Sequence, residues 1–450
     1  MFHQRKGVLL CLFFSSVIIA SGPLTSCVEP QDLTISINPA QALFGTPFSM
    51  TIAGLKPGEH AVLKARSIDG MGTFWDSTAT FEADRNGKID LSSQAPIAGD
   101  YAEPDVMGML WAMQPSNRRD KARPYVAYEH GITVEFTLND AKGRTAAAIL
   151  GRYYQMPDTG LVRVPLDANG CKGFLYYPEK GGPFPGLILL GGSGGGMSDI
   201  KARTLASNGF ATLALAYFRY PGLPGYLIEI PLEYFRRAIE WMKTCQAVQK
   251  GKLGLVGYSK GGECSLLLAS LYDEFSAVAA MVPSAYVWKG VTPLAKSSWT
   301  MAGEPLPFIS TKETEEEVQQ FIRRELTSIR KWYAGGLAAA DPELVNKARI
   351  PVENIKAPIF LASDRADQTW PSVEFCETIV QNLKARHFPY EYKHICGENA
   401  GHHACWPDYI PGTDRGVNAG NPKDKVKWSL IVWKEMLSFL HKYLDAPSKH

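Results

Sequence analysis

The sequence lacks any marked excess of charge of one sign. Its 47 Lys and Arg residues nearly balance 45 Asp and Glu residues, so the formal net charge is +2 over 450 residues. A protein that binds nucleic acid through its phosphates usually carries a strong basic excess. The composition therefore gives no electrostatic reason to expect nucleic acid as a partner.

The sequence also lacks the signatures of nucleotide cofactors. Residues 191–196 read GGSGGG, but no Gly-Lys-Ser/Thr follows them, which excludes a P-loop. The acidic residue that accompanies the glycines of a dinucleotide fold is missing as well. No redox cofactor is expected.

Cysteine is scarce, with eight residues in the chain. A chain of this size can bury a sizeable core and does not need disulfides for stability. Cys396 and Cys405 bracket a short loop and form a candidate disulfide pair. Cys245 and Cys264 fall at expected helix positions, where buried free thiols are the simpler interpretation.

Long apolar runs are also few, and one of them is at the start of the chain. Residues 7–20 are apolar and follow Arg5 and Lys6, a pattern typical of a signal peptide and too short for a membrane span. Residues 24–27 (LTSC) resemble a bacterial lipobox, which predicts lipidation of Cys27. A conventional cleavage site with an incidental cysteine is the alternative. Residues 1–27 thus predict export to the periplasm or cell surface, with a lipid anchor on the membrane surface.

The length of the chain after residue 27 and the change in its residue pattern predict two domains. Residues 28–160 contain short β-rich runs separated by turns, which predict a small all-β, immunoglobulin-like sandwich with a structural or substrate-shaping role. The expected strands are residues 33–37, 48–52, 61–65, 78–81 and 132–137.

Residues 161–450 alternate strands with helices. This pattern predicts an α/β fold with a doubly wound parallel sheet, whose chemistry lies at the carboxyl ends of the strands. A helix is expected to open at Pro231, and another to run from 428 to 444. The expected strands are residues 184–190, 210–217, 253–256, 277–282 and 358–362.

Residues 257–261 (GYSKG) follow one of these strands and precede a helical stretch. A G-x-S-x-G between a strand and a helix indicates a nucleophile elbow, here presenting Ser259. A side chain in place of either glycine would crowd the tight turn. On the pattern alone, an ordinary glycine-rich turn is the alternative.

A serine needs a histidine to take its proton, and the histidine needs an acid to orient it. In this architecture the partners follow the serine in the order acid, then base. Asp364 and Asp367 both lie after the strand at 358–362, and either could be the acid. His402 follows a glycine in a loop after the last strand, so it is preferred as the base over His403, and His394 is expected to have a packing or surface role.

Two other roles for residues near Ser259 and His402 are disfavoured. A metal site from His402, His403 and Asp408 is disfavoured because adjacent histidines diverge in direction. Lys260 is disfavoured as a base because the side chain after the nucleophile points away in this turn. Its backbone N–H is instead expected to help form the oxyanion hole, together with an N–H near Ser193 in the glycine loop.

Several segments together resemble one known family, the serine-type acyl-CoA thioesterases that share their fold with bile-acid-CoA:amino-acid N-acyltransferase. The resemblance covers nearly the whole mature chain. It is carried by residues 107–115, 182–186, 194–196, 208–217, 259–263 and 401–402.

The resemblance implies an α/β-hydrolase fold with Ser259 as nucleophile, Asp367 as acid and His402 as base. Asp367 is favoured over Asp364 because residues 367–370 fit the D-x-x-W stretch of the family. Serine replaces the cysteine of the transferases, which favours water as acceptor. Residues 403–407 and a remodelled helical stretch at 310–336 depart from the family pattern.

The expected reaction is hydrolysis of an acyl thioester without a metal. Export away from coenzyme A leaves another ester or thioester open as the natural substrate. A carboxylesterase, an N-acyltransferase and a noncatalytic binding lipoprotein are the alternatives.

Overall fold

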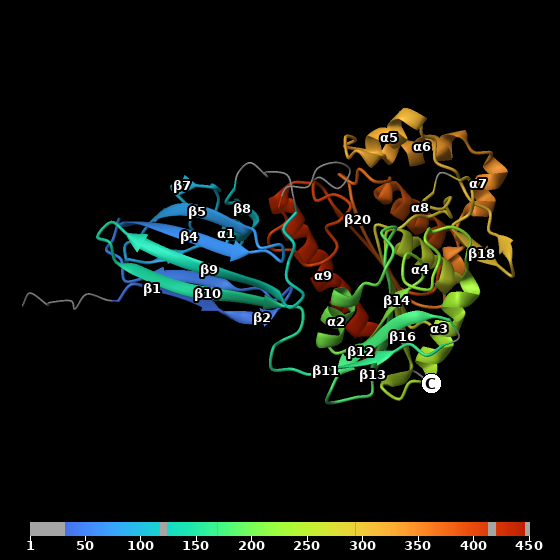
Figure 1. Cartoon of the computed structure of the whole chain (residues 1–450), viewed down its shortest axis with the longest axis horizontal. Helices are drawn as coiled ribbons and strands as arrows, with labels where there is room; N and C mark the ends of the chain where they lie inside the picture. Colours follow the sequence, from blue (N-terminus) through green and yellow to red (C-terminus); the bar gives the residue numbers. More distant parts are fainter. Residues whose placement is uncertain (1–31, 118–123, 169, 293, 413–419, 446–450) are drawn as a thin grey trace, which may run out of the picture.

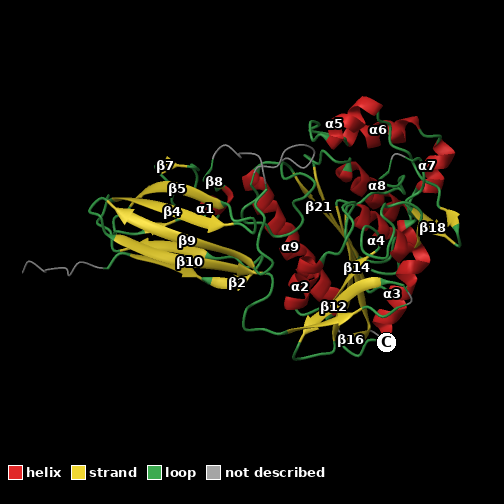
Figure 2. Ribbon diagram, viewed as in Figure 1, coloured by secondary structure: helices red, strands yellow, loops and turns green. Residues whose placement is uncertain are grey.

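The structure is a computed structural model that describes residues 32–117, 124–168, 170–292, 294–412 and 420–445 (Figure 1). The predicted signal peptide and Cys27 lie outside the described residues. A β-rich region precedes a larger region in which helices flank a sheet (Figure 2).

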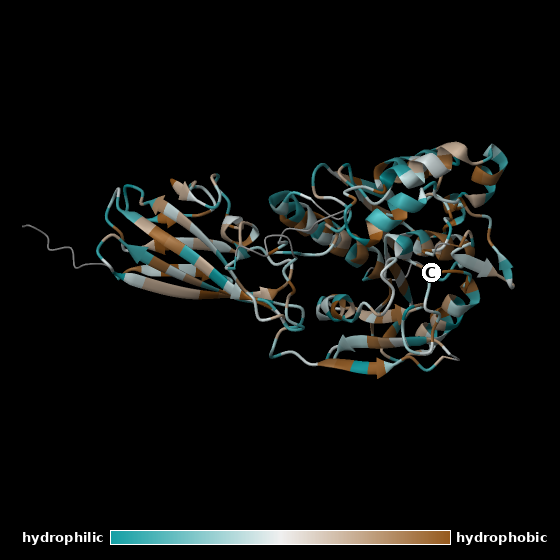
Figure 3. Ribbon diagram, turned by 45° about the horizontal axis from the view of Figure 1, so that its top comes forward, coloured by the Kyte–Doolittle hydropathy of each residue, from teal (hydrophilic) through white to brown (hydrophobic). Residues whose placement is uncertain are grey.

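The β-rich region is a sandwich of two sheets, of three and seven strands. Its strands alternate buried and exposed residues, as in β4 (His60–Ile68), because one face of each sheet packs on the core and the other faces solvent (Figure 3). The predicted all-β fold is confirmed. Its elements are β1 (Thr34–Asn38), β2 (Gln41–Leu43), β3 (Ser49–Ala53), β4, β5 (Phe74–Glu82), β6 (Ile89–Asp90), β7 (Ala98–Gly99), α1 (Gly108–Trp111), β8 (Gln114–Pro115), β9 (Gly131–Asp140) and β10 (Thr145–Tyr153).

The second region contains an eight-stranded sheet in the order β11-β12-β14-β13-β16-β17-β20-β21. Strand β12 is antiparallel to both of its neighbours, and the strands from β14 to β21 run parallel. The strands are β11 (Leu161–Pro165), β12 (Lys172–Pro178), β13 (Phe184–Leu190), β14 (Ala211–Ala216), β16 (Val248–Tyr258), β17 (Ala277–Met281), β20 (Ile359–Asp364) and β21 (Tyr392–Gly397).

Helices cover both faces of this sheet, as expected for a doubly wound fold. Helices α2 (Asp199–Ser207) and α9 (Pro422–Leu444) pack on one face. Helices α3 (Leu232–Thr244), α4 (Lys260–Leu271) and α8 (Ser372–Ala385) pack on the other. With the nucleophile elbow after the fifth strand of the order, this is the α/β-hydrolase fold.

Helix α9 begins at Pro422, six residues before the predicted start at 428. The Asn421 side chain accepts a hydrogen bond from the N–H of Asp424, and Pro422 occupies the first helical position. Both are start signals that the sequence contains. The apolar periodicity alone placed the start too late.

The remaining elements lie in the second region. Helix α5 lies within the stretch 310–336, where a helical segment was predicted, and α6 begins within it and ends at Ala339 (Figure 1). These elements are β15 (Ile230–Pro231), β18 (Trp299–Met301), β19 (Glu304–Pro305), α5 (Glu315–Ile322), α6 (Arg330–Ala339), α7 (Pro342–Ala348) and the 3-10 helix η2 (Val352–Asn354). Within the described residues, no helix combines the length and apolar character needed to cross a membrane.

The two regions share a packed interface. The N–H of Gly45 donates to the Tyr409 hydroxyl at 3.1 Å, and a Cβ on Gly45 would lie 2.2 Å from the Trp433 ring. Tyr409 and Val426 belong to the hydrophobic core of the sandwich. The sandwich is therefore held against α9 and the segment that precedes it.

The candidate disulfide between Cys396 and Cys405 is not formed, and both thiols are free. The Cys405 Sγ is buried and directed at the carbonyl of His402, whereas the Cys396 Sγ is directed at the carbonyl of Gly397. Proximity along the loop does not bring the two sulfurs together, because their side chains pack in different surroundings. Cys245 and Cys264 are also free; Cys264 is buried in α4, as predicted, and Cys245 is half-buried at the end of α3.

Candidate active site

Ser259 lies at the sharp turn between β16 and α4. Its φ of 56° and ψ of −121° are strained for a residue with a side chain. A Cβ on Gly257 would lie 2.1 Å from the Gly261 carbonyl oxygen, and a Cβ on Gly261 would lie 2.4 Å from the Leu190 carbonyl oxygen. The steric need for both glycines is thus confirmed, and it follows from close approach of the backbone.

Ser259, His402 and Asp367 form one hydrogen-bonded line. The Nε2 of His402 lies 2.9 Å from the Ser259 Oγ, and its Nδ1 lies 2.7 Å from the Asp367 Oδ2. The three residues are 4%, 2% and 0% exposed, respectively. The structure therefore brings together the three residues that the sequence analysis selected.

The Asp367 carboxylate is held from both sides. Its Oδ2 faces His402, and its Oδ1 accepts hydrogen bonds from the N–H groups of Thr369 at 2.9 Å and Trp370 at 3.2 Å. Burial alone would raise the pKa of Asp367, but the charge and hydrogen bond of His402 outweigh it and lower the pKa. Asp367 is therefore ionised at neutral pH and can stabilise an imidazolium.

Asp364, the other candidate acid, binds backbone N–H groups and does not contact His402 through its side chain. Its Oδ1 accepts hydrogen bonds from the N–H groups of Gly401 and Ala366 at 2.9 Å, and its Oδ2 accepts one from Ala400 at 3.1 Å. Burial raises its pKa, and these three donors act in the opposite direction. Asp364 thus anchors the backbone immediately before His402, a role that the sequence analysis missed.

The glycine loop approaches the serine closely. A Cβ on Gly192 would lie 3.2 Å from the Ser259 Cβ, and the Tyr217 hydroxyl donates to the Gly191 carbonyl at 2.5 Å. Lys260 is the first residue of α4, where backbone N–H groups have no acceptor within the helix. The loop that contains Ser193 and the Lys260 N–H therefore flank Ser259, while Ser193 itself is exposed.

The Lys260 side chain points away from Ser259, as predicted. Its Nζ lies 2.7 Å from both carboxylate oxygens of Glu263, and both side chains are almost fully buried. The Trp299 Nε1 donates to the same carboxylate at 2.9 Å. This pair ties the first turn of α4 to β18. The sequence contained a signal for it, since residues three apart on a helix face each other.

The other two histidines do not contact Ser259. The His394 Nε2 lies 2.7 Å from the Ser363 Oγ, in keeping with the predicted packing role. Desolvation, followed by the charges of His402, Lys201 and Lys425, lowers the pKa of His403 to about 3. Both ring nitrogens of His402 are engaged by Asp367 and Ser259, and the part of the chain that the structure describes holds no cluster suited to a metal ion.

Two family models match the chain. One describes the C-terminal part of the BAAT and acyl-CoA thioester hydrolase family and matches residues 230–446; the other describes the N-terminal region of the same family and matches residues 45–165. The chain belongs to this family. It is accordingly an enzyme of the thioesterase type, and the match extends over the sandwich as well as the α/β region.

Curated relatives agree with this assignment. Acyl-coenzyme A thioesterase 1 of Rattus norvegicus is 28% identical over 439 residues, covering 93% of this chain and 98% of the relative. The human enzyme of the same name is 28% identical, covering 92% and 97%. Acyl-coenzyme A thioesterase 2, mitochondrial, of Rattus norvegicus is also 28% identical, covering 92% and 90%.

Solved structures show more distant likeness. The acylaminoacyl peptidase of Pyrococcus horikoshii is 12% identical with a TM-score of 0.44, covering 92% of this chain and 78% of that one. MGS-M1, an alpha/beta hydrolase from a deep-sea metagenome library, is 14% identical with a TM-score of 0.40, covering 64% and 99%. The fold assignment rests on the strand order of this chain.

Proposed function

We propose that the protein is a serine hydrolase that cleaves acyl thioesters, with Ser259 as nucleophile, His402 as base and Asp367 as the acid that orients it. The observation that carries this proposal is the continuous line of hydrogen bonds from Ser259 through His402 to Asp367, at 2.9 and 2.7 Å. Nucleophile, base and orienting acid within hydrogen-bond reach are the geometry that acyl transfer requires.

In the first step, the Nε2 of His402 takes the proton of the Ser259 hydroxyl while Oγ bonds to the acyl carbonyl carbon. The negative charge that develops on the carbonyl oxygen is stabilised by the N–H of Lys260 and an N–H of the glycine loop near Ser193. The bond from carbon to the leaving sulfur or oxygen then breaks, and His402 returns its proton to that atom. The products are an acyl ester on Ser259 and a free thiol or alcohol.

In the second step, water replaces the leaving group. His402 removes a proton from water, the hydroxide attacks the acyl ester, and the proton returns to the Ser259 oxygen as the free acid departs. Asp367 remains ionised throughout and stabilises the imidazolium formed in each step. The sequence of steps uses only residues of this chain and requires no metal or redox cofactor.

The relatives named acyl-coenzyme A thioesterases support a thioester as the substrate. An oxygen ester would enter the same steps, and an amine in place of water would make the protein an N-acyltransferase. The serine nucleophile favours water as the acyl acceptor, because the N-acyltransferases of this family use cysteine instead. Hydrolysis of an acyl thioester is thus the reaction that we propose.

We also propose that the enzyme is exported and held on a membrane surface by lipid on Cys27. The lipobox-like residues 24–27 support this proposal, and they lie outside the described residues. The test compares wild type with Cys27→Ser in a bacterial host by detergent phase partition and intact mass. Loss of the lipid mass and a shift to the aqueous phase are expected; a variant that differs from wild type only by the exchange of sulfur for oxygen, and that partitions as wild type does, would contradict lipidation.

Steady-state hydrolysis tests the catalytic proposal. Wild type should turn over palmitoyl-CoA, and Ser259→Ala should lose at least about a thousandfold in kcat/KM. Ser93→Ala, an exposed serine in the sandwich, is the matched control and should behave as wild type.

The same assay separates the alternative functions. Addition of glycine or taurine that diverts product to an amide would show a transferase, and exclusive turnover of p-nitrophenyl palmitate would show a carboxylesterase. No turnover of either substrate by the folded wild type would favour a binding protein.

A further inference from the structure

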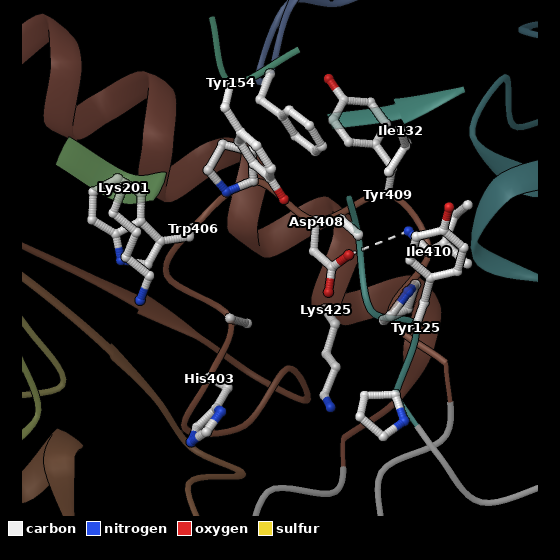
Figure 4. Close-up of a pocket in the computed structure, with 16 residues that line it drawn as sticks. Tyr125, Ile132, Tyr154, Lys201, His403, Trp406, Asp408, Tyr409, Ile410 and Lys425 are labelled. Carbon is white, nitrogen blue, oxygen red and sulfur yellow. Dashed lines mark hydrogen bonds between the residues drawn. The ribbon is translucent and has the colours of Figure 1, made fainter. Parts of the chain in front are cut away.

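A cavity of about 320 Å³ opens where the sandwich meets the α/β region (Figure 4). Its walls come from both regions, and the segment directly after His402 forms one of them. The volume is at the lower end of the range for ligand pockets, about 300–1,000 Å³. The lining residues that matter here are Tyr125, Tyr154, Lys201, His403, Trp406, Asp408 and Lys425.

Lys201, on the first turn of α2, brings a positive charge to this cavity. Its Nζ lies 5.0 Å from the centre of the Tyr258 ring and 5.1 Å from the centre of the Trp406 ring, and Figure 4 shows it beside Trp406. Among the residues that the structure describes, no carboxylate lies within ion-pair distance of it. Desolvation lowers the pKa of Lys201 to about 8. An ammonium group in this position gains more from a bound anion than one in open solvent.

Three titratable groups close to Lys201 carry no negative charge that would compensate its own. Desolvation raises the pKa of Cys405 and of Tyr258, and desolvation with nearby positive charges lowers that of His403 to about 3. All three are therefore uncharged at neutral pH, and Lys201 is the group in this set that is ionised.

Lys425 also lines the cavity, below Asp408 in the view of Figure 4. It is 5% exposed, and its charge, like that of Lys201, lowers the pKa of His403. Asp408 is the one carboxylate among the lining residues, and both Asp408 and Lys425 have interaction partners in the protein. Lys201 is therefore the group in the lining that favours an anionic occupant.

The cavity adjoins the loop that contains His402. In the proposed mechanism, His402 gives its proton to the leaving group, so this group has to pass His402. The ring of His403, which lines the cavity, lies 5.6 Å from that of His402. Tyr258, whose ring Lys201 faces, donates its hydroxyl hydrogen bond to the His402 carbonyl at 3.1 Å.

We propose that this cavity binds the phosphate of an acyl donor's leaving group, with Lys201 as the residue that recognises it. This inference rests on the proposed function, since it assigns the leaving-group side of the same site. The phosphate could belong to a nucleotide thiol such as coenzyme A or to a glycerophosphate headgroup of a lipid. Both present the same anion to the lysine.

Two matched pairs of substrates test the inference and distinguish the sources. Palmitoyl-CoA and S-palmitoyl-pantetheine are thioesters with and without phosphate. Palmitoyl-glycerol 3-phosphate and 1-palmitoylglycerol are the corresponding oxygen esters. Each is assayed with wild type and with Lys201→Met, which keeps most of the aliphatic length and removes the charge, and with Lys201→Arg, which retains the charge.

Lys201→Met should raise KM about tenfold or more for the phosphate-bearing member of one pair, since a charge-assisted contact is lost. It should change kcat/KM for the phosphate-free member less than about twofold, and Lys201→Arg should restore much of the loss. Lys250→Met, an exposed lysine near the opposite end of β16, is the control and should match wild type. A loss in the thioester pair assigns a nucleotide thiol, and a loss in the other pair assigns a lipid headgroup.

An equal loss on both members of a pair would overturn the proposal, because it would show that Lys201 only supports the packing of Tyr258. No loss on any substrate would overturn it as well. Binding of free coenzyme A and of glycerol 3-phosphate to Ser259→Ala, measured by calorimetry with and without Lys201→Met, gives a readout independent of turnover. If neither ligand binds while wild type hydrolyses the phosphate-free substrates, the assignment of the cavity fails and the proposed function stands. If a phosphate-bearing ligand binds through Lys201 and no substrate is hydrolysed, the assignment of the cavity stands and the proposed function fails.

Discussion

Replacement of Asp364 by Asn separates the two acids that follow β20. The Asp364 carboxylate accepts three backbone hydrogen bonds, two of them from Ala400 and Gly401, which precede His402. Asparagine offers one carbonyl oxygen, so one oxygen acceptor is lost and an NH₂ group faces a buried N–H. We therefore expect the loop before His402 to loosen.

The magnitude follows from the contacts that are lost. A hydrogen bond to a charged group contributes about 1.5–3 kcal/mol, and an orphaned buried donor costs about 1–3 kcal/mol. A loss of about 2 kcal/mol corresponds to about 3 °C in Tm for a domain of roughly 290 residues. Because His402 keeps its contact with Asp367, we expect kcat to fall only about tenfold.

The assay pairs Asp364→Asn with Asp367→Asn, measuring Tm by differential scanning calorimetry and kcat with palmitoyl-CoA. Asp364→Asn should lower Tm and moderately lower kcat, whereas Asp367→Asn should act mainly on kcat. If Asp364→Asn abolished turnover and Asp367→Asn retained it, Asp364 would be the catalytic acid and the reasoning would be refuted.

Three further predictions concern single positions. Asp367→Asn should lower kcat by about 10³–10⁴, because the neutral amide neither orients His402 nor stabilises its charge; a loss below tenfold would contradict this role. Gly257→Ala should destabilise the elbow and remove activity, since its Cβ would lie 2.1 Å from a backbone oxygen, and a variant with wild-type Tm and rate would contradict the steric argument. The ratio of kcat/KM for palmitoyl-CoA to that for S-palmitoyl-pantetheine should fall as pH rises past about 8, because Lys201 loses its proton there, and should stay level in Lys201→Arg; a level ratio in wild type would exclude Lys201 from recognition of the coenzyme A phosphate.

The sequence predicted the fold well because its strands are marked by local patterns. Strand β13 covers the predicted residues 184–190, and the elbow at Ser259 lies at the expected end of β16. These elements depend on short apolar runs and glycine positions, which can be recognised without knowledge of the partners. The start of α9 was predicted too late because the apolar periodicity begins after the Asn421-Pro422 start signal.

The residues of the candidate site could be predicted from the sequence, but the separate roles of Asp364 and Asp367 could be predicted only in part. From the residues alone, Asp364 and Asp367 were equivalent, and a family resemblance was needed to choose. The choice depends on a loop that turns Asp367 toward His402 and leaves Asp364 to bind backbone N–H groups. Such a division depends on tertiary geometry that a one-dimensional pattern does not contain.

The cavity between the two regions was not predictable. Lys201 on α2, Tyr154 after β10 and Trp406 after the last strand are far apart in the sequence and meet only through domain packing. The same holds for the thiols of Cys396 and Cys405, which are close in sequence and are not joined. Sequence proximity was a poor guide in both cases, because packing decides which side chains face one another.

Labelling with a fluorophosphonate probe, followed by peptide mass spectrometry, tests the central claim most directly. The probe reacts with a serine whose hydroxyl is activated by a neighbouring base, so we predict one adduct, on Ser259, and its loss in His402→Ala. A folded wild-type protein that gives no adduct, or an adduct on another residue, would contradict the claim that Ser259 is the nucleophile.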